Sequence, residues 1–153
     1  MLNIVLYQPE IAMNTGNIGR TCSVTGSSLH LIHPLGFVVD DRKLARAGMD
    51  YWHSLNVSFY ENFDDFVCKN NDPKIYMVET NAGRFYTETS FPRNAFIMLG
   101  SESGGIPGHI LQDYADTAVR IPMLQGSRSL NLASCAAVVI FEALRQHGFA
   151  NLS

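Results

Sequence analysis

The sequence predicts an α/β fold in which a mostly parallel sheet carries helices on both faces. Short apolar runs alternate with helix-like segments along the 153 residues, an order that is typical of parallel sheets. The apolar runs show no regular polar alternation, as in strands that are covered on both sides. Hydrophobic residues form 46% of the chain and charged residues 16%, which indicates a compact globular protein. We expect a single domain over residues 1–153.

The first part of the chain is predicted to contain three strands and three helices. The strands are short apolar runs bounded by polar or turn residues, at 3–7, 28–33 and 57–60. The helices begin at Asn or Asp and end at Gly or Asn, at 14–26, 40–48 and 62–70. The middle helix is basic, because Arg42, Lys43 and Arg46 lie on it at helical spacing.

The second part is predicted to contain three further strands, at 74–80, 95–102 and 117–123. A short helix follows Pro107, and a long helix from about Ser129 to His147 is ended by Gly148. This last helix has consecutive small residues at 133–137, which allow another segment of backbone to approach it closely. Either ordinary burial of the helix or a chain threaded tightly beside it would account for them.

Three of these strands end in loops that could form a ligand site. The loops follow Val78, Leu99 and Met123, and ligands of open α/β sheets bind beyond the carboxyl ends of the strands. Glycine would let the loop backbone approach a ligand and offer its amides. Such glycines occur at Gly83, Gly100, Gly104, Gly105 and Gly126. The alternative is that each tight turn merely requires glycine, and three such loops on one edge favour a site.

Familiar catalytic motifs are missing from these loops. Ile106-Pro107 stand where a P-loop requires Lys and Ser or Thr, and no Gly-x-Gly-x-x-Gly follows the first strand. Glu102 occupies the place of the serine in a nucleophile elbow. His30 and His33 lack a third ligand nearby, so we interpret them as structural residues. The sequence therefore disfavours nucleoside triphosphate binding, serine hydrolase activity and a metal site.

Charge and cysteine content narrow the class of protein further. The net charge of −3 argues against an indiscriminate nucleic-acid binder but leaves room for a local basic face. Cys22, Cys68 and Cys135 are odd in number and widely spaced, which suits reduced thiols. No apolar run could span a bilayer, and the N-terminus lacks the features of a signal peptide. We expect a cytoplasmic protein.

Three segments taken together resemble the motifs of the SPOUT methyltransferases, in the order that this superfamily uses. They are "NTGNIGRTC" (14–22), "LGSESGGIP" (99–107) and "IPMLQGSRSLNLASC" (121–135). The short length, the start "NIVLYQPEIAMNTGNIGR" and the stretch "RKLARAGMDYW" (42–52) narrow the resemblance. They are similar to the tRNA 2'-O-methyltransferases that act on a cytidine or uridine at the wobble position. The similarity covers essentially the whole chain.

This resemblance implies a C-terminal trefoil knot, with Gln125–Ser129 as the turn before the final helix. It also implies that S-adenosylmethionine binds in a pocket made by the loops after Val78, Leu99 and Ile121. The cofactor-lining residues carried over are Val78, Gly100, Ile121, Ser129 and Leu130. Members of the family are homodimers with the active site at the subunit interface.

The resemblance assigns catalysis to Arg20. A guanidinium stays protonated in proteins, so we expect Arg20 to hold a phosphate and stabilise charge on the 2'-oxygen, rather than to act as a base. The proton could leave through the phosphate, a water or Glu102. Asn14 is the second candidate catalytic residue: we expect it to orient this arrangement and also to cap the first helix, and the alternative is a plain N-cap. No metal is needed.

Contacts with tRNA are expected from the basic residues Arg42, Lys43, Arg46 and Arg128. A solvated helix face is the alternative for the first three. Two positions depart from the family pattern: Ser103-Gly104-Gly105 lacks an Arg that many relatives carry, and Phe141 replaces a Tyr of some wobble enzymes.

Three other functions stay open from the sequence. One is 2'-O-methylation of another tRNA position or of ribosomal RNA, although such relatives often carry an extra RNA-binding domain. The second is a non-catalytic RNA- or nucleotide-binding module, and the third is a small-molecule hydrolase that would lack a recognisable nucleophile.

Overall fold

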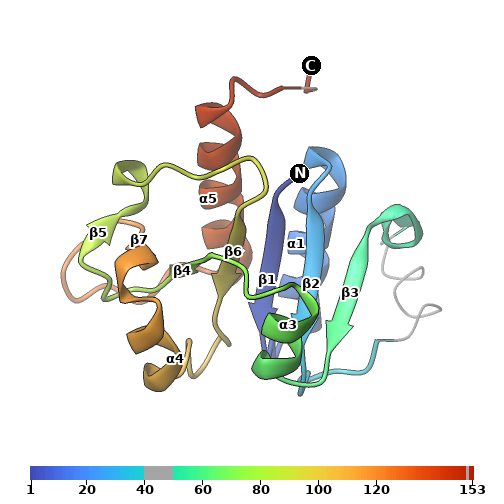
Figure 1. Ribbon diagram of the computed structural model, residues 1–153, viewed down its shortest axis with the longest axis horizontal. Coiled ribbons are helices and arrows are strands. Elements are labelled where there is room, and N and C mark those ends of the chain that lie inside the picture. The colour runs from blue at the N-terminus through green and yellow to red at the C-terminus, as the bar shows by residue number, and fades with distance from the viewer. Residues whose placement is uncertain (40–49, 151) are drawn as a thin grey trace.

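The computed structural model describes residues 1–39, 50–150 and 152–153, and contains a seven-stranded sheet (Figure 1). The strand order is β3-β2-β1-β6-β4-β7-β5, and every pairing is parallel. The strands are β1 (Asn3–Tyr7), β2 (Ser28–Ile32), β3 (Val57–Tyr60), β4 (Ile75–Val78), β5 (Arg84–Phe85), β6 (Phe96–Leu99) and β7 (Val119–Arg120). The predicted α/β class is confirmed.

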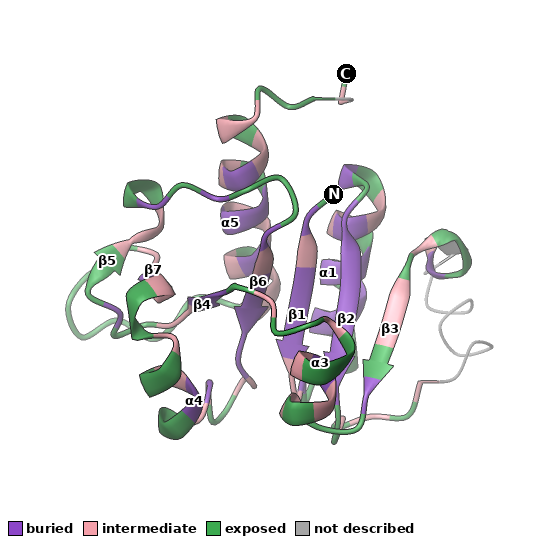
Figure 2. Cartoon of the chain, in the orientation of Figure 1, coloured by how far each residue is buried: buried purple, intermediate pink, exposed green. Residues whose placement is uncertain are grey.

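Helices cover both faces of this sheet, so the central strands are buried (Figure 2). α1 (Ala12–Thr25) and α5 (Leu132–Gln146) pack together over one face, around a core that includes Ile18 and Val139. α3 (Phe63–Lys69) and α4 (Gly108–Asp113) cover the other face, around a second core. Short 3-10 helices are η1 (Asp50–Ser54), η2 (Tyr86–Glu88) and η3 (Ala115–Thr117).

The largest departures from the predicted elements are at the C-terminal end. The strand predicted over 117–123 is only β7, because Pro122 has no N–H to offer a neighbouring strand. The last helix begins at Leu132 rather than Ser129, since the Asn131 side chain accepts hydrogen bonds from Ala133 N and Ser134 N. The helix predicted over 40–48 lies outside the described residues.

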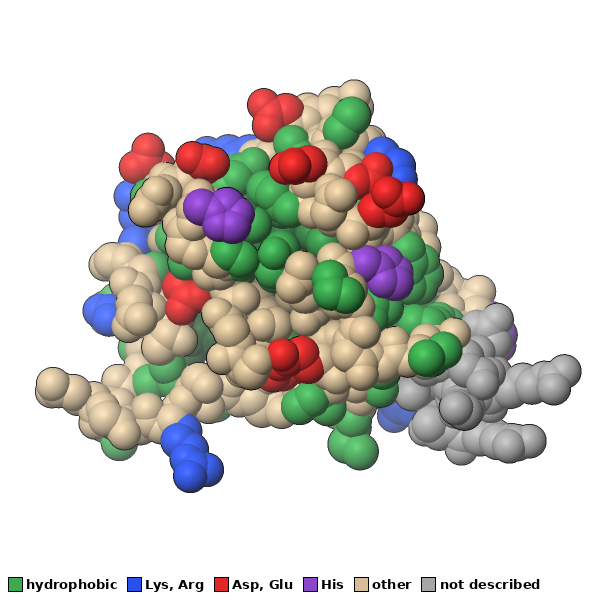
Figure 3. Space-filling view, turned by 90° about the horizontal axis from the view of Figure 1, so that it is seen from below, with side chains coloured by type: hydrophobic (Ala, Val, Ile, Leu, Met, Phe, Trp, Pro, Cys, Tyr) green, Lys and Arg blue, Asp and Glu red, His purple; other side chains and the backbone are tan. Residues whose placement is uncertain are grey.

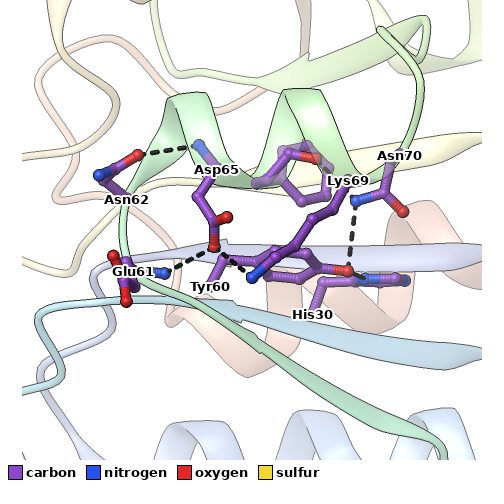
Figure 4. Close-up of polar contacts among 8 residues, drawn as sticks. His30, Tyr60, Glu61, Asn62, Asp65, Lys69 and Asn70 are labelled. Atoms are coloured by element: carbon purple, nitrogen blue, oxygen red, sulfur yellow. Dashed lines mark hydrogen bonds and ion pairs between the residues drawn. The ribbon is translucent and has the colours of Figure 1, made fainter.

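A polar network crosses the second core (Figure 4). His30 on β2 is 6% exposed, and its Nδ1 lies 2.8 Å from the Tyr60 hydroxyl while its Nε2 lies 3.2 Å from Asn3 Oδ1. Asn70 Nδ2 donates to the Tyr60 oxygen at 3.2 Å. The tyrosine proton is thereby directed at Nδ1, which fits a neutral ring. Burial lowers the pKa of His30 from 6.5 to about 4.

α3 begins beside this network with a conventional cap (Figure 4). Asn62 Oδ1 accepts from Asp65 N at 2.8 Å, and Lys69 Nζ lies 2.8 Å from Asp65 Oδ2. Asn62 or Asp64 could start the helix predicted over 62–70, and the structure shows that Asn62 is the cap. No helix in the described ranges has the length and apolar character that a membrane span requires.

Candidate functional site

A cavity of about 610 Å³ opens at the edge of the sheet where the strands end. Figure 3 views the molecule from this edge. The walls come from the segments after β4 and β6, from the start of α1, and from the chain between β7 and α5. The three loops singled out in the sequence therefore meet at one cavity, although their residues are up to about fifty positions apart.

All five residues predicted to contact a cofactor line this cavity: Val78, Gly100, Ile121, Ser129 and Leu130. They reach it from different places in the chain, because the parallel sheet brings the ends of β4, β6 and β7 together. Ile121, Ser129 and Leu130 belong to the irregular segment between β7 and α5. The late start of α5 leaves Ser129 and Leu130 outside the helix and against the cavity.

Gly100 is required by a close backbone contact in the cavity wall. A Cβ at this position would lie 2.2 Å from Gly105 C and 2.4 Å from Ile106 N. Gly105 has a φ of +64°, which favours glycine. Two glycines behave differently from the prediction: Gly83 and Gly126 do not line the cavity, and a Cβ at either would meet open space.

Asn14 connects the three sequence motifs by hydrogen bonds. Its Nδ2 donates to Glu102 Oε1 at 3.0 Å, and its Oδ1 accepts from Asn131 Nδ2 at 3.0 Å. The suggestion that Asn14 caps the first helix is wrong, because α1 already includes Ala12 and Met13. The N-cap residue is Ile11, whose side chain cannot accept a hydrogen bond. Asn14 is buried and lines the cavity.

The Glu102 carboxylate binds the backbone immediately before α1. It accepts from the backbone N–H of Glu10 at 2.8 Å and of Ile11 at 3.2 Å, besides Asn14 Nδ2. In the opposite direction, the Glu10 carboxylate accepts from Ser103 N at 2.8 Å and from Ser103 Oγ at 2.6 Å. We call these residues the Glu10–Glu102 clamp. It joins the loop after β1 to the loop after β6.

The sequence reasoning did not select Glu79 or Asn81, which also line the cavity. Glu79 directly follows β4, the same position relative to its strand as Gly100 after β6. Its place immediately after a buried strand was the signal that could have identified it. The half-buried thiol of Cys135 reaches the cavity as well, and burial raises its pKa.

The predicted catalytic and RNA-contacting arginines lie elsewhere. Arg20 is exposed on α1 and does not line the cavity. Its guanidinium lies 5.3 Å from the centre of the Tyr51 ring, and the Tyr51 hydroxyl donates to Gly16 O. Arg128 is exposed in the segment between β7 and α5 and is also absent from the cavity wall. Arg42, Lys43 and Arg46 lie outside the described residues.

Residues 1–141 match the SpoU rRNA Methylase family, and the chain belongs to that family. The chain is 44% identical to the tRNA (cytidine(34)-2'-O)-methyltransferase of Saccharophagus degradans, over 98% of each chain. It is 41% identical to the enzyme of the same name from Escherichia coli K12, over 97% of this chain and 96% of the relative.

A solved structure that concerns "the 2-OH methylation of C/U34 on tRNA" has the same fold. It superposes with a TM-score of 0.90 at 37% identity, and 97% of each chain is covered. The α/β fold with a parallel sheet, expected from the methyltransferase resemblance, is therefore confirmed.

Proposed function

We propose that the protein transfers a methyl group from S-adenosylmethionine to the ribose 2'-hydroxyl of the wobble cytidine or uridine in a tRNA anticodon. The observation that carries the proposal is the convergence of all three motifs on one cavity. Full-length similarity to tRNA (cytidine(34)-2'-O)-methyltransferases supports the choice of substrate. In this proposal residues 1–153 act as one catalytic domain, and a tRNA substrate places it in the cytoplasm.

A cavity of about 610 Å³ is large enough for a nucleoside cofactor such as S-adenosylmethionine. Apolar side chains of Val78, Ile121 and Leu130 can enclose a planar base, and the backbone of Gly100, which also lines the cavity, can read its edge. S-adenosylmethionine would supply an activated methyl group when bound. By the family resemblance we also infer a knot at the C-terminal end, where Ile121, Met123 and residues 129–131 line the cavity before α5.

The chemistry that remains for the protein is to position the ribose and help its hydroxyl lose a proton. We assign Arg20 to the phosphate next to the reacting ribose, where a permanent positive charge stabilises the developing 2'-oxyanion. The Glu102 carboxylate is held by three N–H donors, so it serves to fix Asn14 and the start of α1. We therefore assign proton acceptance to the phosphate or a water.

We infer that a second copy of the chain completes the tRNA site, because Arg20 does not line the cavity of its own chain. α1 and α5 pack together and carry the exposed apolar side chains Met13 (73%), Val24 (65%) and Phe141 (45%), which would be covered in a homodimer. Arg128 and the basic residues Arg42, Lys43 and Arg46 would then contact phosphates of the bound tRNA.

The dimer is tested by the single change Met13→Glu, which places a charge in the proposed interface. Sedimentation velocity should show a monomer, with transfer activity lost. Val38→Glu is the matched control, because Val38 is 82% exposed in the segment after β2 and belongs to neither α1 nor α5. A wild-type protein that sediments as a monomer at the concentration of the activity assay would contradict the proposal.

The reaction is tested with labelled S-adenosylmethionine and tRNA transcripts that carry a wobble cytidine or uridine. Label should appear in the 2'-O-methylated wobble nucleoside. A transcript with a 2'-deoxy nucleotide at that position alone should accept no label, because it lacks only the acceptor oxygen. Label that persists in the deoxy transcript, or that enters ribosomal RNA instead, would reject the assignment. Cofactor binding without transfer to any RNA would favour the non-catalytic binding module.

The role of Arg20 is tested by Arg20→Lys, which keeps the charge but removes the paired N–H groups of the guanidinium. We expect kcat to fall about a hundredfold or more, as when a donor to an oxyanion is removed. The dissociation constant of S-adenosylmethionine should stay unchanged, because Arg20 is outside the cavity. A normal kcat would exclude Arg20 from the transition state.

A further inference from the structure

The charge in the cavity wall is of one sign. Glu79 and Glu102 line the cavity, and no Lys, Arg or His among the described residues does so. On the face seen in Figure 3, acidic side chains occur well inside the outline, while Lys and Arg lie towards its edges. The charged side chains that line the cavity in the described part of the chain are therefore both negative, and a ligand in the cavity is exposed to their field.

The two carboxylates differ in how far the protein satisfies them. Glu102 receives three N–H donors, as described above. Glu79 receives one, from Thr80 N to Oε1 at 2.8 Å. Its other oxygen, Oε2, accepts no hydrogen bond from the described part of the chain. A carboxylate has about four acceptor positions, so Glu79 keeps most of its capacity for a ligand.

Glu79 lies where its unused acceptor positions can contact a ligand in the cavity. The residue is half-buried at the end of β4. Its Oε2 lies 3.3 Å from where a Cβ on Gly105 would be, which places the carboxylate between the loop after β4 and the loop after β6. A charge that is partly withdrawn from water acts more strongly on its neighbours than one on an open surface.

We propose that Glu79 makes the cavity selective for a positively charged ligand, so that S-adenosylmethionine binds more tightly than its demethylated product. This inference rests on the proposed function. The cofactor carries a sulfonium, an ammonium and a carboxylate, with a net charge of about +1, whereas S-adenosylhomocysteine has no sulfonium and is close to neutral at pH 7. Glu79 would thereby favour exchange of product for fresh cofactor.

The charge balance of the reaction explains why the preference changes at turnover. The sulfur–methyl bond breaks, its electron pair stays on sulfur, and the methyl group forms a bond to the 2'-oxygen. The proton of the 2'-hydroxyl leaves to solvent. The cavity therefore loses one positive charge while Glu79 keeps its negative charge, and the attraction that held the ligand is weakened.

The test is isothermal titration of the wild type and Glu79→Gln with three ligands. These are S-adenosylmethionine, S-adenosylhomocysteine, and an analogue in which an aminomethine group replaces the methylsulfonium and restores the positive charge. Glutamine keeps an oxygen for Thr80 N, so the loop should be preserved. We expect affinity for both cationic ligands to fall about tenfold, and affinity for the neutral product to change less than about twofold.

The matched control is Asp64→Asn, which also removes one negative charge. Asp64 is exposed in the first turn of α3 and does not line the cavity, so its change should leave all three affinities unaltered. Thermal unfolding of each variant confirms that the fold is kept. Higher salt should weaken the cationic ligands more than the neutral one in the wild type, and this difference should shrink in Glu79→Gln.

The outcomes separate this inference from the proposed function. Equal weakening of cationic and neutral ligands would overturn it, because Glu79 would then accept a hydrogen bond from a part that both share, such as a ribose hydroxyl. Unchanged affinities would also overturn it. A wild-type protein that binds neither S-adenosylmethionine nor its product would instead reject the proposed function, and the inference with it.

Discussion

Acid should destabilise the protein through His30, which the fold holds in its neutral form. Burial lowers the pKa of this ring from 6.5 to about 4. The unfolded chain therefore binds the proton more strongly than the native one, and a falling pH favours unfolding. The contribution of His30 is complete above about pH 6.5 and is lost as the pH falls towards about 4.

The size of this effect follows from the two pKa values. The gap between 6.5 and about 4 corresponds to about 3 kcal/mol in full. About 2 kcal/mol of it should be lost between pH 7.5 and pH 5. A protonated Nδ1 would have to donate to the Tyr60 oxygen, so the Tyr60 O–H, which now donates to Nδ1, would lose its acceptor.

The assay is chemical unfolding at a series of pH values, with His30→Gln compared with the wild type. The variant should be less stable than the wild type at pH 7.5, because Tyr60 and Asn3 lose their hydrogen bonds to the imidazole ring. Its free energy of unfolding should fall less steeply as the pH is lowered. The difference between the two curves isolates His30, as the other titrating groups are shared. His109→Gln is the control, since that exposed ring contacts water in both states. Parallel curves for wild type and His30→Gln would refute the reasoning, as would an NMR titration of His30 with a midpoint near 6.5.

Three further changes test the site and its support. Gly100→Ala should abolish cofactor binding, because the new Cβ would lie 2.2 Å from Gly105 C. Gly105 would have to move by about 1.2 Å to reach an ordinary contact distance of 3.4 Å. Gly83→Ala is the control: its Cβ would meet open space, so this variant should bind the cofactor normally in the same titration. Asn14→Asp would face a carboxylate at 3.0 Å, so cofactor affinity should fall at pH 8 and partly recover at pH 5; equal affinity at both would contradict this. Asn62→Ala should lower the unfolding free energy by about 1 kcal/mol through loss of the α3 cap, with cofactor affinity unchanged.

Apolar patterning predicted the core of the sheet and the loops that bound the cavity. Continuous runs such as 3–7 and 96–99 are strands in the structure because both faces of the sheet are covered. β5 was missed, since Arg84–Phe85 has no apolar run, and it is ordered by pairing with β7. Such a strand depends on a tertiary neighbour rather than on its own residues.

Polar side chains at the site were harder to predict than the strands. Ser129 and Asn131 are both good helix caps, and only the fold decides that Asn131 is used. Asn14 looked like a cap for the same reason, but its partners come from residues 88 and 117 positions away. Local sequence contains no signal for such distant partners, so the role of Asn14 could not be separated from its propensity.

The hydrogen bond between Asn14 and Asn131 has a consequence for synthesis of the chain. It joins residues 117 positions apart, and the cavity takes walls from Ile11 through to Cys135. A nascent polypeptide cannot assemble this site until the start of α5 has left the ribosome. S-adenosylmethionine should therefore stabilise only the finished molecule, because a ligand that binds the native state alone shifts folding by mass action. The fraction of newly synthesised chains that bind S-adenosylmethionine would then equal the fraction that have folded completely.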